Sequence, residues 1–258
     1  MSQITYAQDG QVGIITMNRL PVNSIDINFV RDFDVAVDAA EMDGECLVVV
    51  VRSSLPGLFS GGGDIQSFRD NGPRENMEML ALLNEALNKL AQSGKIYIAE
   101  IGGHALGGGY EIALACDLRF AAAGQYRIGL PEIGLGLMPA AGGTQRLAAL
   151  IGPARALEFM ITGTSVTADD ALPLGLVNRL FNEAELTEQT LAFARQLISG
   201  ATLAIGQIKR SIYDGYCSSL PVGLAVERRS VSPLFASQDV QEGLAAFIER
   251  RKPHFTGQ

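Results

Sequence analysis

Two acidic residues stand in apolar stretches of this sequence and are candidates for moving protons. Glu111 opens the apolar segment 112–115, and Glu132 follows Pro131 in a stretch of glycines, leucines and isoleucines. Burial among apolar side chains raises the pKa of a carboxyl group, so such a group can exchange a proton near neutral pH. Each glutamate also has a simpler explanation, because the first turn of a helix favours an acid and Glu132 could lie in a surface loop. The pattern alone leaves both explanations open.

Two glycine-rich segments could supply backbone N–H groups to a reacting oxygen. Residues 60–65 read Ser-Gly-Gly-Gly-Asp-Ile, and residues 102–111 read Gly-Gly-His-Ala-Leu-Gly-Gly-Gly-Tyr-Glu. Each follows a run that predicts a buried strand, and glycines leave amide N–H groups uncovered by side chains. If the two segments lie close together, a pair of such donors would stabilise an enolate or a tetrahedral oxygen. A tight strand-to-helix turn explains either segment alone, and a nucleotide-binding GxGxxG loop is a weaker alternative for the second.

The elements that would position these groups alternate between strands and helices. Short apolar runs predict strands, and apolar residues at helical spacing predict amphipathic helices. We expect strands at 12–17, 47–52, 96–101 and 119–122, and a strand-like piece at 176–180. We expect helices at 28–41, 75–93 and 110–118, and an almost wholly helical pattern from 183 onward. This order predicts an α/β core with a C-terminal helical appendage.

The composition limits the partners and cofactors that we expect. The chain has 258 residues, 47% of them hydrophobic, and a net charge of −8. An acidic chain is poorly suited to nucleic-acid phosphates, so we expect no nucleic-acid partner. Metal-ligand spacing is absent, and the three cysteines, Cys46, Cys116 and Cys217, suggest no disulfide framework. We find no leader pattern and no apolar run of the roughly 20 residues that cross a bilayer, so we expect a cytoplasmic protein with no membrane partner.

The ordered set of motifs resembles the crotonase (enoyl-CoA hydratase/isomerase) superfamily. The matching segments cover essentially the whole chain and include 59–65, 103–111, Asp117, 129–136, 139–147 and 247–253. The resemblance implies an α/β fold, with a spiral of ββα units over residues 1–195. A helical region, residues 196–258, would pack on this core or on a neighbouring subunit. The resemblance also implies a homotrimer or a dimer of trimers.

The same resemblance implies a reaction and the residues that carry it. The backbone amides of Gly63 and Gly108 would form an oxyanion hole for the thioester oxygen of an acyl-CoA. Glu111 and Glu132 match the two acids of the hydratases, with Glu111 as the base and Glu132 as the proton donor at the α-carbon. The implied reaction is the reversible hydration of a trans-2-enoyl-CoA to a 3-hydroxyacyl-CoA. Because the acyl-CoA thioester substrate is already activated, we expect neither a metal nor a separate cofactor.

Further positions are expected to contact the substrate or its coenzyme A portion. The resemblance implies such contacts at Arg19, Val22, Ser24, Gly61, Asp64, Ile65, Gln66, Gly107 and Lys252. The CoA phosphates need positive or amide partners. In this acidic chain the local basic candidates are Arg19 and the cluster 250–252.

Two other functions remain open. Relatives that only move a double bond generally keep just the acid at the Glu132 position, and the loop 18–24 resembles that of mitochondrial-type isomerases, so a Δ3–Δ2 enoyl-CoA isomerase is one alternative. An RNA-binding or scaffolding member of the same fold is the other. Glu100 lies in a strand where relatives usually carry a small residue, and we interpret it as a core acid paired with a base. We interpret His104 as a packed or capping side chain.

Overall fold

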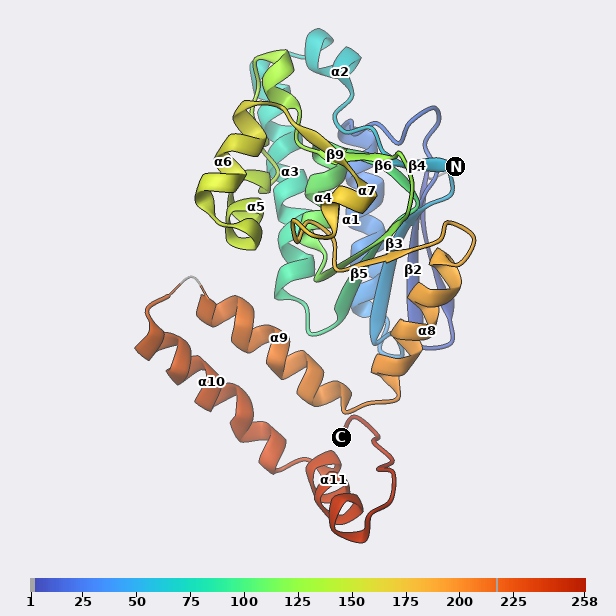
Figure 1. Ribbon diagram of the computed structural model, residues 1–258, viewed down its shortest axis with the longest axis vertical. Helices are drawn as coiled ribbons and strands as arrows, with labels where there is room; N and C mark the ends of the chain where they lie inside the picture. Colours follow the sequence, from blue (N-terminus) through green and yellow to red (C-terminus); the bar gives the residue numbers. More distant parts are fainter. Residues whose placement is uncertain (1–2, 217) are drawn as a thin grey trace.

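The strands lie in two sheets (Figure 1). The computed structural model describes residues 3–216 and 218–258, so Cys217 and the first two residues of the expected N-terminus lie outside the described residues. The larger sheet has six strands, in the order β1 (Ile4–Asp9), β2 (Val12–Met17), β3 (Val48–Ser53), β5 (Ile96–Ile101), β7 (Leu118–Ala122) and β10 (Arg179–Phe181). The smaller has four, in the order β4 (Gly57–Ser60), β6 (Gly103–Leu106), β8 (Arg127–Gly129) and β9 (Ser165–Thr167).

Successive parts of the chain repeat a strand–strand–helix unit. The pairs β3–β4, β5–β6 and β7–β8 each give their first strand to the larger sheet and their second strand to the smaller one. Helices follow each pair: α2 (Ile65–Asp70) and α3 (Pro73–Gln92), then α4 (Gly108–Ala115), then the 3-10 helix η1 (Glu132–Leu135) and α5 (Gly143–Ile151). Parallel pairing within both sheets follows from these crossovers. The predicted spiral of ββα units is confirmed.

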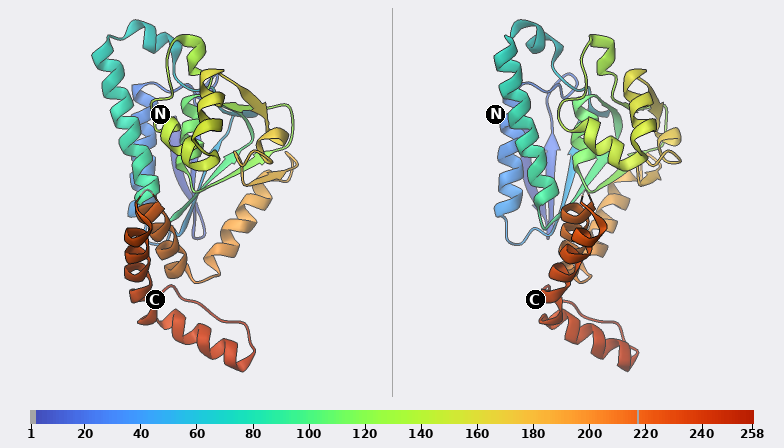
Figure 2. Two further views of the ribbon diagram at one scale, coloured as in Figure 1. Left: turned by 60° about the vertical axis from the view of Figure 1, so that its left-hand side comes forward. Right: turned by 90° about the vertical axis from the view of Figure 1, so that its left-hand side faces the viewer.

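Helices cover both faces of the larger sheet because its central strands are apolar on both sides. In β3, Val49 and Val51 belong to the cluster formed with α1 (Ile27–Met42) and α3. Val48 and Val50 point to the other face, where they pack with α8 (Leu186–Ile198). Figure 2 shows the two layers on opposite sides of the sheet. The continuous run of valines therefore gives a strand buried on both faces, as expected.

The last helices extend away from the core as an arm (Figures 1 and 2). After α6 (Pro153–Ile161), α7 (Ala168–Ala171) and α8, the arm consists of α9 (Thr202–Tyr216), α10 (Leu220–Phe235) and α11 (Gln238–Glu249). Lys209 of α9 ties the arm to the core, because its buried ammonium group lies 2.8 Å from the Asp117 carboxylate. The expected division at residue 195 falls inside α8, so the extent of an independent C-terminal region remains a proposal.

The fold departs from the expectations in several places, and β9 is among the strands that were not predicted. β1, β4 and β6 were not predicted, because β1 is mostly exposed and the other two are short and contain glycine. In β6, a β-carbon on Gly103 would lie 1.8 Å from the carbonyl carbon of Gly57, so two neighbouring strands approach at a contact that admits only glycine. The helix expected to reach residue 118 ends at Ala115, because the chain becomes extended at Cys116 and enters β7. Among the described residues, no helix is long and apolar enough to span a membrane.

Candidate active site

A cavity of about 480 Å³ lies where the two glycine-rich segments meet. Apolar side chains of α2 and α3, among them Phe68, Met79 and Leu83, form one wall. Seven of the residues proposed from the sequence line it: Gly61, Gly63, Ile65, Gly107, Gly108, Glu111 and Glu132. Residues from four separate parts of the chain thus share one largely apolar cavity, which is the usual character of a small-molecule site.

Backbone hydrogen bonds hold the first glycine-rich segment against the early loop. The bonds form a short parallel ladder: Gly61 N to Val22 O at 2.8 Å, Ile25 N to Gly62 O at 2.8 Å, and Asp64 N to Ile25 O at 2.9 Å. Gly63 is paired with Ile25 at the centre of this ladder. In a parallel ladder the residue opposite such a pair turns its own N–H to the other side. The Gly63 amide is therefore directed away from the early loop.

Gly63 and Gly108 bring two backbone N–H groups to the cavity. Gly108 begins α4, and the first N–H groups of a helix have no acceptor within the helix. A β-carbon on Gly108 would lie 3.8 Å from the Gly63 nitrogen, and one on Gly62 would lie 2.7 Å from the Leu106 carbonyl oxygen. The two segments therefore touch, and glycine is required at the contact. The arrangement can offer two donors to one oxygen.

Glu111 is buried in α4 and anchored through one carboxylate oxygen. Its Oε1 accepts hydrogen bonds from the amides of Ala141, at 2.7 Å, and Gly143, at 2.8 Å. Burial raises the pKa of Glu111, while these two amides and the nearby Arg146 act in the opposite direction. A carboxylate that is fixed in this way and still borders the cavity is suited to accept a proton from a bound molecule.

Glu132 begins η1 and lies in a different environment. Its Oε2 is buried and has no hydrogen-bond partner among the described residues. Burial, and to a lesser degree the negative charge of Glu111, raise the pKa of Glu132 to about 7. A β-carbon on Gly107 would lie 3.1 Å from the other carboxylate oxygen, so Glu132 packs directly against the second glycine-rich segment. Two neighbouring acids with unlike surroundings can divide the roles of base and proton donor.

The loop that holds Glu111 carries no residue that was predicted as part of the site. Arg146 donates to the Ala141 carbonyl at 2.8 Å, and Asn84 of α3 donates to the Ala140 carbonyl at 2.8 Å. These bonds set the position of the amides that anchor Glu111. The segment 139–147 was part of the family resemblance, and its paired glycines before a helix were the available signal.

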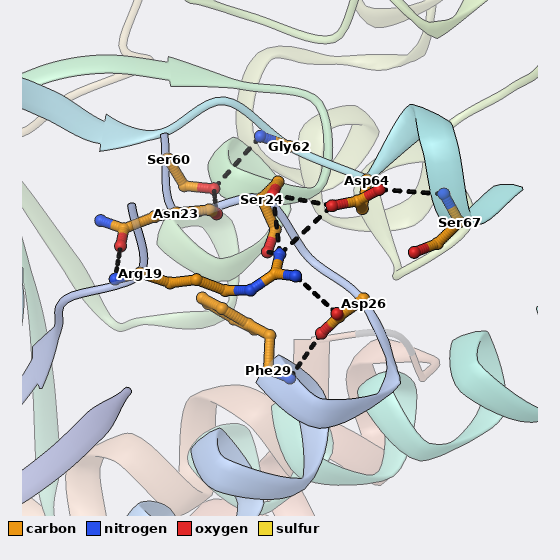
Figure 3. Close-up of polar contacts among 9 residues, drawn as sticks. All are labelled: Arg19, Asn23, Ser24, Asp26, Phe29, Ser60, Gly62, Asp64 and Ser67. Carbon is orange, nitrogen blue, oxygen red and sulfur yellow. Dashed lines mark hydrogen bonds and ion pairs between the residues drawn. The ribbon is translucent and has the colours of Figure 1, made fainter. Parts of the chain in front are cut away.

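The expected substrate contacts in the early loop take part in a polar network (Figure 3). Arg19 contacts Asp26, Asp64 and both the hydroxyl and the carbonyl of Ser24. Val22 lies against Gly61, at 3.3 Å from where a β-carbon of that glycine would be. All four expected residues near this loop, Arg19, Val22, Ser24 and Asp64, are therefore neighbours, beside the cavity wall rather than within its lining.

Two further expected contacts, Gln66 and Lys252, are also absent from the cavity lining. Gln66 is exposed on α2 and bonds to Asp70 one turn later. Lys252 is exposed and follows the end of α11 at Glu249. Its neighbour Arg251 is engaged by Glu242 and Glu249. Within a single chain the structure does not bring Lys252 to the cavity, so its role remains a prediction for an assembly of several copies.

Glu100 and His104, the other polar residues considered in the sequence, lie outside the cavity lining and pack within the fold. Glu100 is buried and faces α8, where it accepts a hydrogen bond from the Thr187 hydroxyl at 2.9 Å. The direct hydrogen-bond partner is a hydroxyl group, and the expected base is present as a neighbour, because Arg52 lies opposite Glu100 in the β3–β5 pairing. Burial raises the pKa of Glu100, while the Thr187 hydroxyl and the charge of Arg52 act in the opposite direction. His104 accepts the Arg127 N–H at 3.0 Å and stacks edge-on with Tyr126, as expected for a packed side chain. Across residues 3–216 and 218–258, no group of acidic, histidine and cysteine side chains is arranged to hold a metal ion.

Comparisons with known proteins show which family this chain resembles. A family model described as enoyl-CoA hydratase/isomerase matches residues 7–258. A short-chain-enoyl-CoA hydratase from Clostridium acetobutylicum is 32% identical, over 98% of this chain and 97% of that protein. A crotonyl-CoA hydratase from Syntrophomonas wolfei is 31% identical, also over 98% of this chain and 97% of the relative. The crystal structure of an enoyl-CoA hydratase from Geobacillus kaustophilus has a TM-score of 0.97 and 42% identity, and the match covers 100% of this chain and 98% of that one.

Proposed function

This chain belongs to the enoyl-CoA hydratase/isomerase family, and from that premise we propose that it adds water reversibly to a trans-2-enoyl-CoA. The product is a 3-hydroxyacyl-CoA. One observation carries the proposal: two carboxyl groups with unlike surroundings border a cavity that also contains the amides of Gly63 and Gly108. Water addition needs both a base and a proton donor, and this site offers one of each.

The two amides bind the thioester oxygen of the substrate. As water attacks the β-carbon, negative charge moves through the conjugated system onto that oxygen. Donors that are already in position stabilise this charge without reorganisation, and the loss of one donor typically costs roughly 3–4 kcal/mol of barrier. The positive end of the α4 dipole, at Gly108, acts in the same direction.

Glu111 and Glu132 move the protons. Glu111 takes a proton from water while the water oxygen bonds to the β-carbon. Glu132 gives its proton to the α-carbon as the enolate collapses to the thioester. A pKa of about 7 leaves Glu132 protonated in a large fraction of molecules at neutral pH, which supports its role as the donor. The α-carbon gains a hydrogen, the β-carbon gains a hydroxyl group, and solvent restores both carboxyl groups.

A short acyl chain is the substrate class that we propose. The named relatives are a short-chain-enoyl-CoA hydratase and a crotonyl-CoA hydratase. Met79 and Leu83 supply an apolar wall for the hydrocarbon part. Coenzyme A enters as part of this substrate, so the proposed reaction needs no separate cofactor. The cytoplasmic location expected from the sequence remains a proposal.

We also keep the homotrimer or dimer of trimers as a proposal. The arm carries large apolar side chains that are exposed in a single chain, with Phe235 70%, Phe247 85% and Ile248 79% exposed. Apolar surface of this kind is normally covered by a partner. Light scattering coupled to size-exclusion chromatography tests the expected three or six copies.

The test of the reaction is a panel of enoyl-CoA thioesters with double bonds at position 2 or position 3. The proposal predicts loss of the conjugated thioester absorbance of crotonyl-CoA and formation of 3-hydroxybutyryl-CoA. If the protein shifts the double bond of a 3-enoyl-CoA and adds no water to the 2-enoyl-CoA, then it is an isomerase and the proposal is wrong.

A further inference from the structure

The guanidinium group of Arg19 bridges two carboxylates beside the glycine-rich segment (Figure 3). Its Nη2 lies 2.5 Å from Asp26, and its Nη1 lies 2.7 Å from the Ser24 hydroxyl and 3.3 Å from Asp64. The Nη1 group also donates to the Ser24 carbonyl. The arginine side chain is only 16% exposed. One side chain therefore joins the early loop to the residue that follows Gly63.

We propose that Arg19 is a positioning residue that sets the direction of the Gly63 N–H in the oxyanion hole. This inference rests on the proposed function, because it assigns Arg19 to the same reaction. It differs from the expectation that Arg19 binds the phosphates of coenzyme A.

The geometry of one peptide group links Arg19 to the oxyanion donor. The Gly62 carbonyl and the Gly63 N–H belong to the same planar trans peptide and point in opposite directions. The carbonyl is held by the Ile25 N–H at 2.8 Å, so the opposite N–H is directed away from Ile25. Ile25 lies between Ser24 and Asp26, and Arg19 holds both of these neighbours.

Asp64 fixes the next peptide group, on the other side of the Gly63 α-carbon. Its N–H donates to the Ile25 carbonyl at 2.9 Å. Its Oδ1 accepts from the Ser67 N–H at 2.9 Å and so caps α2, while its Oδ2 contacts Ser24 and Arg19. The hydrogen bond from the Ser67 amide lowers the pKa of Asp64, and the contacts with Ser24 and Arg19 act in the same direction. The Asp64 carboxylate therefore remains charged at neutral pH. The residues on both sides of Gly63 are therefore hydrogen-bonded to Ile25, and Arg19 contacts the neighbours of Ile25 and the side chain of Asp64.

A backbone bond of Arg19 adds a second path. The Arg19 N–H donates to the Asn23 side chain at 2.7 Å. The carbonyl of Asn23 accepts from the Ser60 hydroxyl at 2.8 Å, and that hydroxyl in turn accepts the Gly62 N–H at 3.1 Å. Both sides of the Gly62 residue therefore depend on the position of the early loop.

Charge argues against a phosphate at this place. Two carboxylates, Asp26 and Asp64, surround one guanidinium group, so the cluster has a net charge of −1. A phosphate that approaches Arg19 meets this negative charge, and it would have to displace hydrogen bonds that are already made. Arginine is suited to the bridging role because its planar fork reaches two acceptors at once, which the single ammonium group of lysine does not reproduce.

The experiment compares variants on two substrates that differ only in the phosphate-bearing part. Crotonyl-CoA carries the 3′-phospho-ADP portion of coenzyme A, and crotonyl-pantetheine lacks it. We expect Arg19→Met to lower kcat by about 10- to 100-fold on both substrates, because a misdirected donor no longer matches the developing charge. We expect Arg19→Lys to recover little of this loss. The matched control is Arg69→Met, which removes the same charge from an exposed pair on α2 and leaves both rates unchanged.

An enolate-binding measurement separates positioning from a loss of folded protein. Acetoacetyl-CoA forms an enolate whose absorbance reports charge on the thioester oxygen, and butyryl-CoA forms none. With Arg19→Met we expect at least 10-fold weaker binding of the acetoacetyl-CoA enolate and butyryl-CoA binding within about 3-fold of the unchanged protein. The thermal unfolding temperature of each variant verifies that the compared samples are folded.

Three results would overturn the inference. A loss seen on crotonyl-CoA alone, mainly in KM and weaker at high salt, would assign Arg19 to the phosphates. Full rescue by Arg19→Lys would mean that charge alone matters. Equal weakening of enolate and butyryl-CoA binding would make the role purely structural. The proposed function is judged separately, by the crotonyl-CoA rate of the unchanged protein, and the enolate measurement needs no turnover.

Discussion

Substitution of Glu132 by glutamine should change how the stability of the protein depends on pH. In the native state, burial raises the pKa of Glu132 from 4.5 to about 7. The native protein therefore keeps this proton at pH values where the unfolded chain has released it. Wherever the unfolded state binds fewer protons, the free energy of unfolding falls as the pH rises. Glu132 thus lowers stability between about pH 4.5 and pH 7, and the full cost is present above pH 7.

The magnitude follows from the shift in pKa. One pKa unit corresponds to about 1.4 kcal/mol, so a shift of about 2.5 units gives an upper bound of about 3 kcal/mol. Glu132 is only partly buried, and solvent screening reduces this bound to about 1–2 kcal/mol. The repulsion between Glu132 and Glu111 is already part of this shift and adds nothing further to the bound.

The assay is urea unfolding of the unchanged protein and of Glu132→Gln at pH 5 and pH 8. We compare the free energy of unfolding of the variant with that of the unchanged protein. From pH 5 to pH 8 this difference should shift in favour of the variant by about 1–2 kcal/mol. Glu85→Gln, at an exposed position of α3, is the control and should show no such gain. If the stability difference between Glu132→Gln and the unchanged protein is the same at both pH values, the burial argument for Glu132 as a proton donor is refuted.

Two further perturbations test the surroundings of the site. Gly107→Ala places a β-carbon 3.1 Å from the Glu132 carboxylate, at a residue whose backbone φ of 53° favours glycine. The kcat on crotonyl-CoA should therefore fall by about 10-fold or more. An unchanged kcat would contradict the close packing of Gly107 against Glu132. Lys209→Met removes the only described ion-pair partner of the buried Asp117, at 2.8 Å, and leaves the carboxylate with the Tyr97 N–H. The free energy of unfolding in urea should fall by about 3–5 kcal/mol, and a loss below about 1 kcal/mol would mean that the pair does not anchor the arm.

The parts of the fold that could be predicted are those with an unambiguous burial pattern. Strands β3 and β5 are buried runs of apolar residues, and their positions follow from the sequence within a residue. β4 and β6 could not be predicted in this way, since each has only four residues and depends on contacts between distant glycines. Glycine is required at position 103 because the backbone of Gly57, 46 residues earlier, lies against it. The residues around Gly103 in the sequence give no sign of that contact.

The candidate site shows the same division. Glu111 and Glu132 were found because acids in apolar stretches are unusual, and the structure brings both to one cavity. The amides that anchor Glu111 have no side-chain signature, so Ala141 and Gly143 were not recognised. Arg19 was noticed as a basic residue, but its carboxylate partners depend on how the early loop folds back, and residue 64 is far away in sequence.

In the proposed reaction, two carboxyl groups act together with a backbone oxyanion hole to add water. The most direct measurement is the steady-state hydration of crotonyl-CoA by the unchanged protein, by Glu111→Gln and by Glu132→Gln. Glutamine keeps the size of each side chain and removes its ability to exchange a proton. Each variant should lower kcat by roughly 10²-fold or more while the protein remains folded. Near-normal hydration rates in both variants would contradict this proposal.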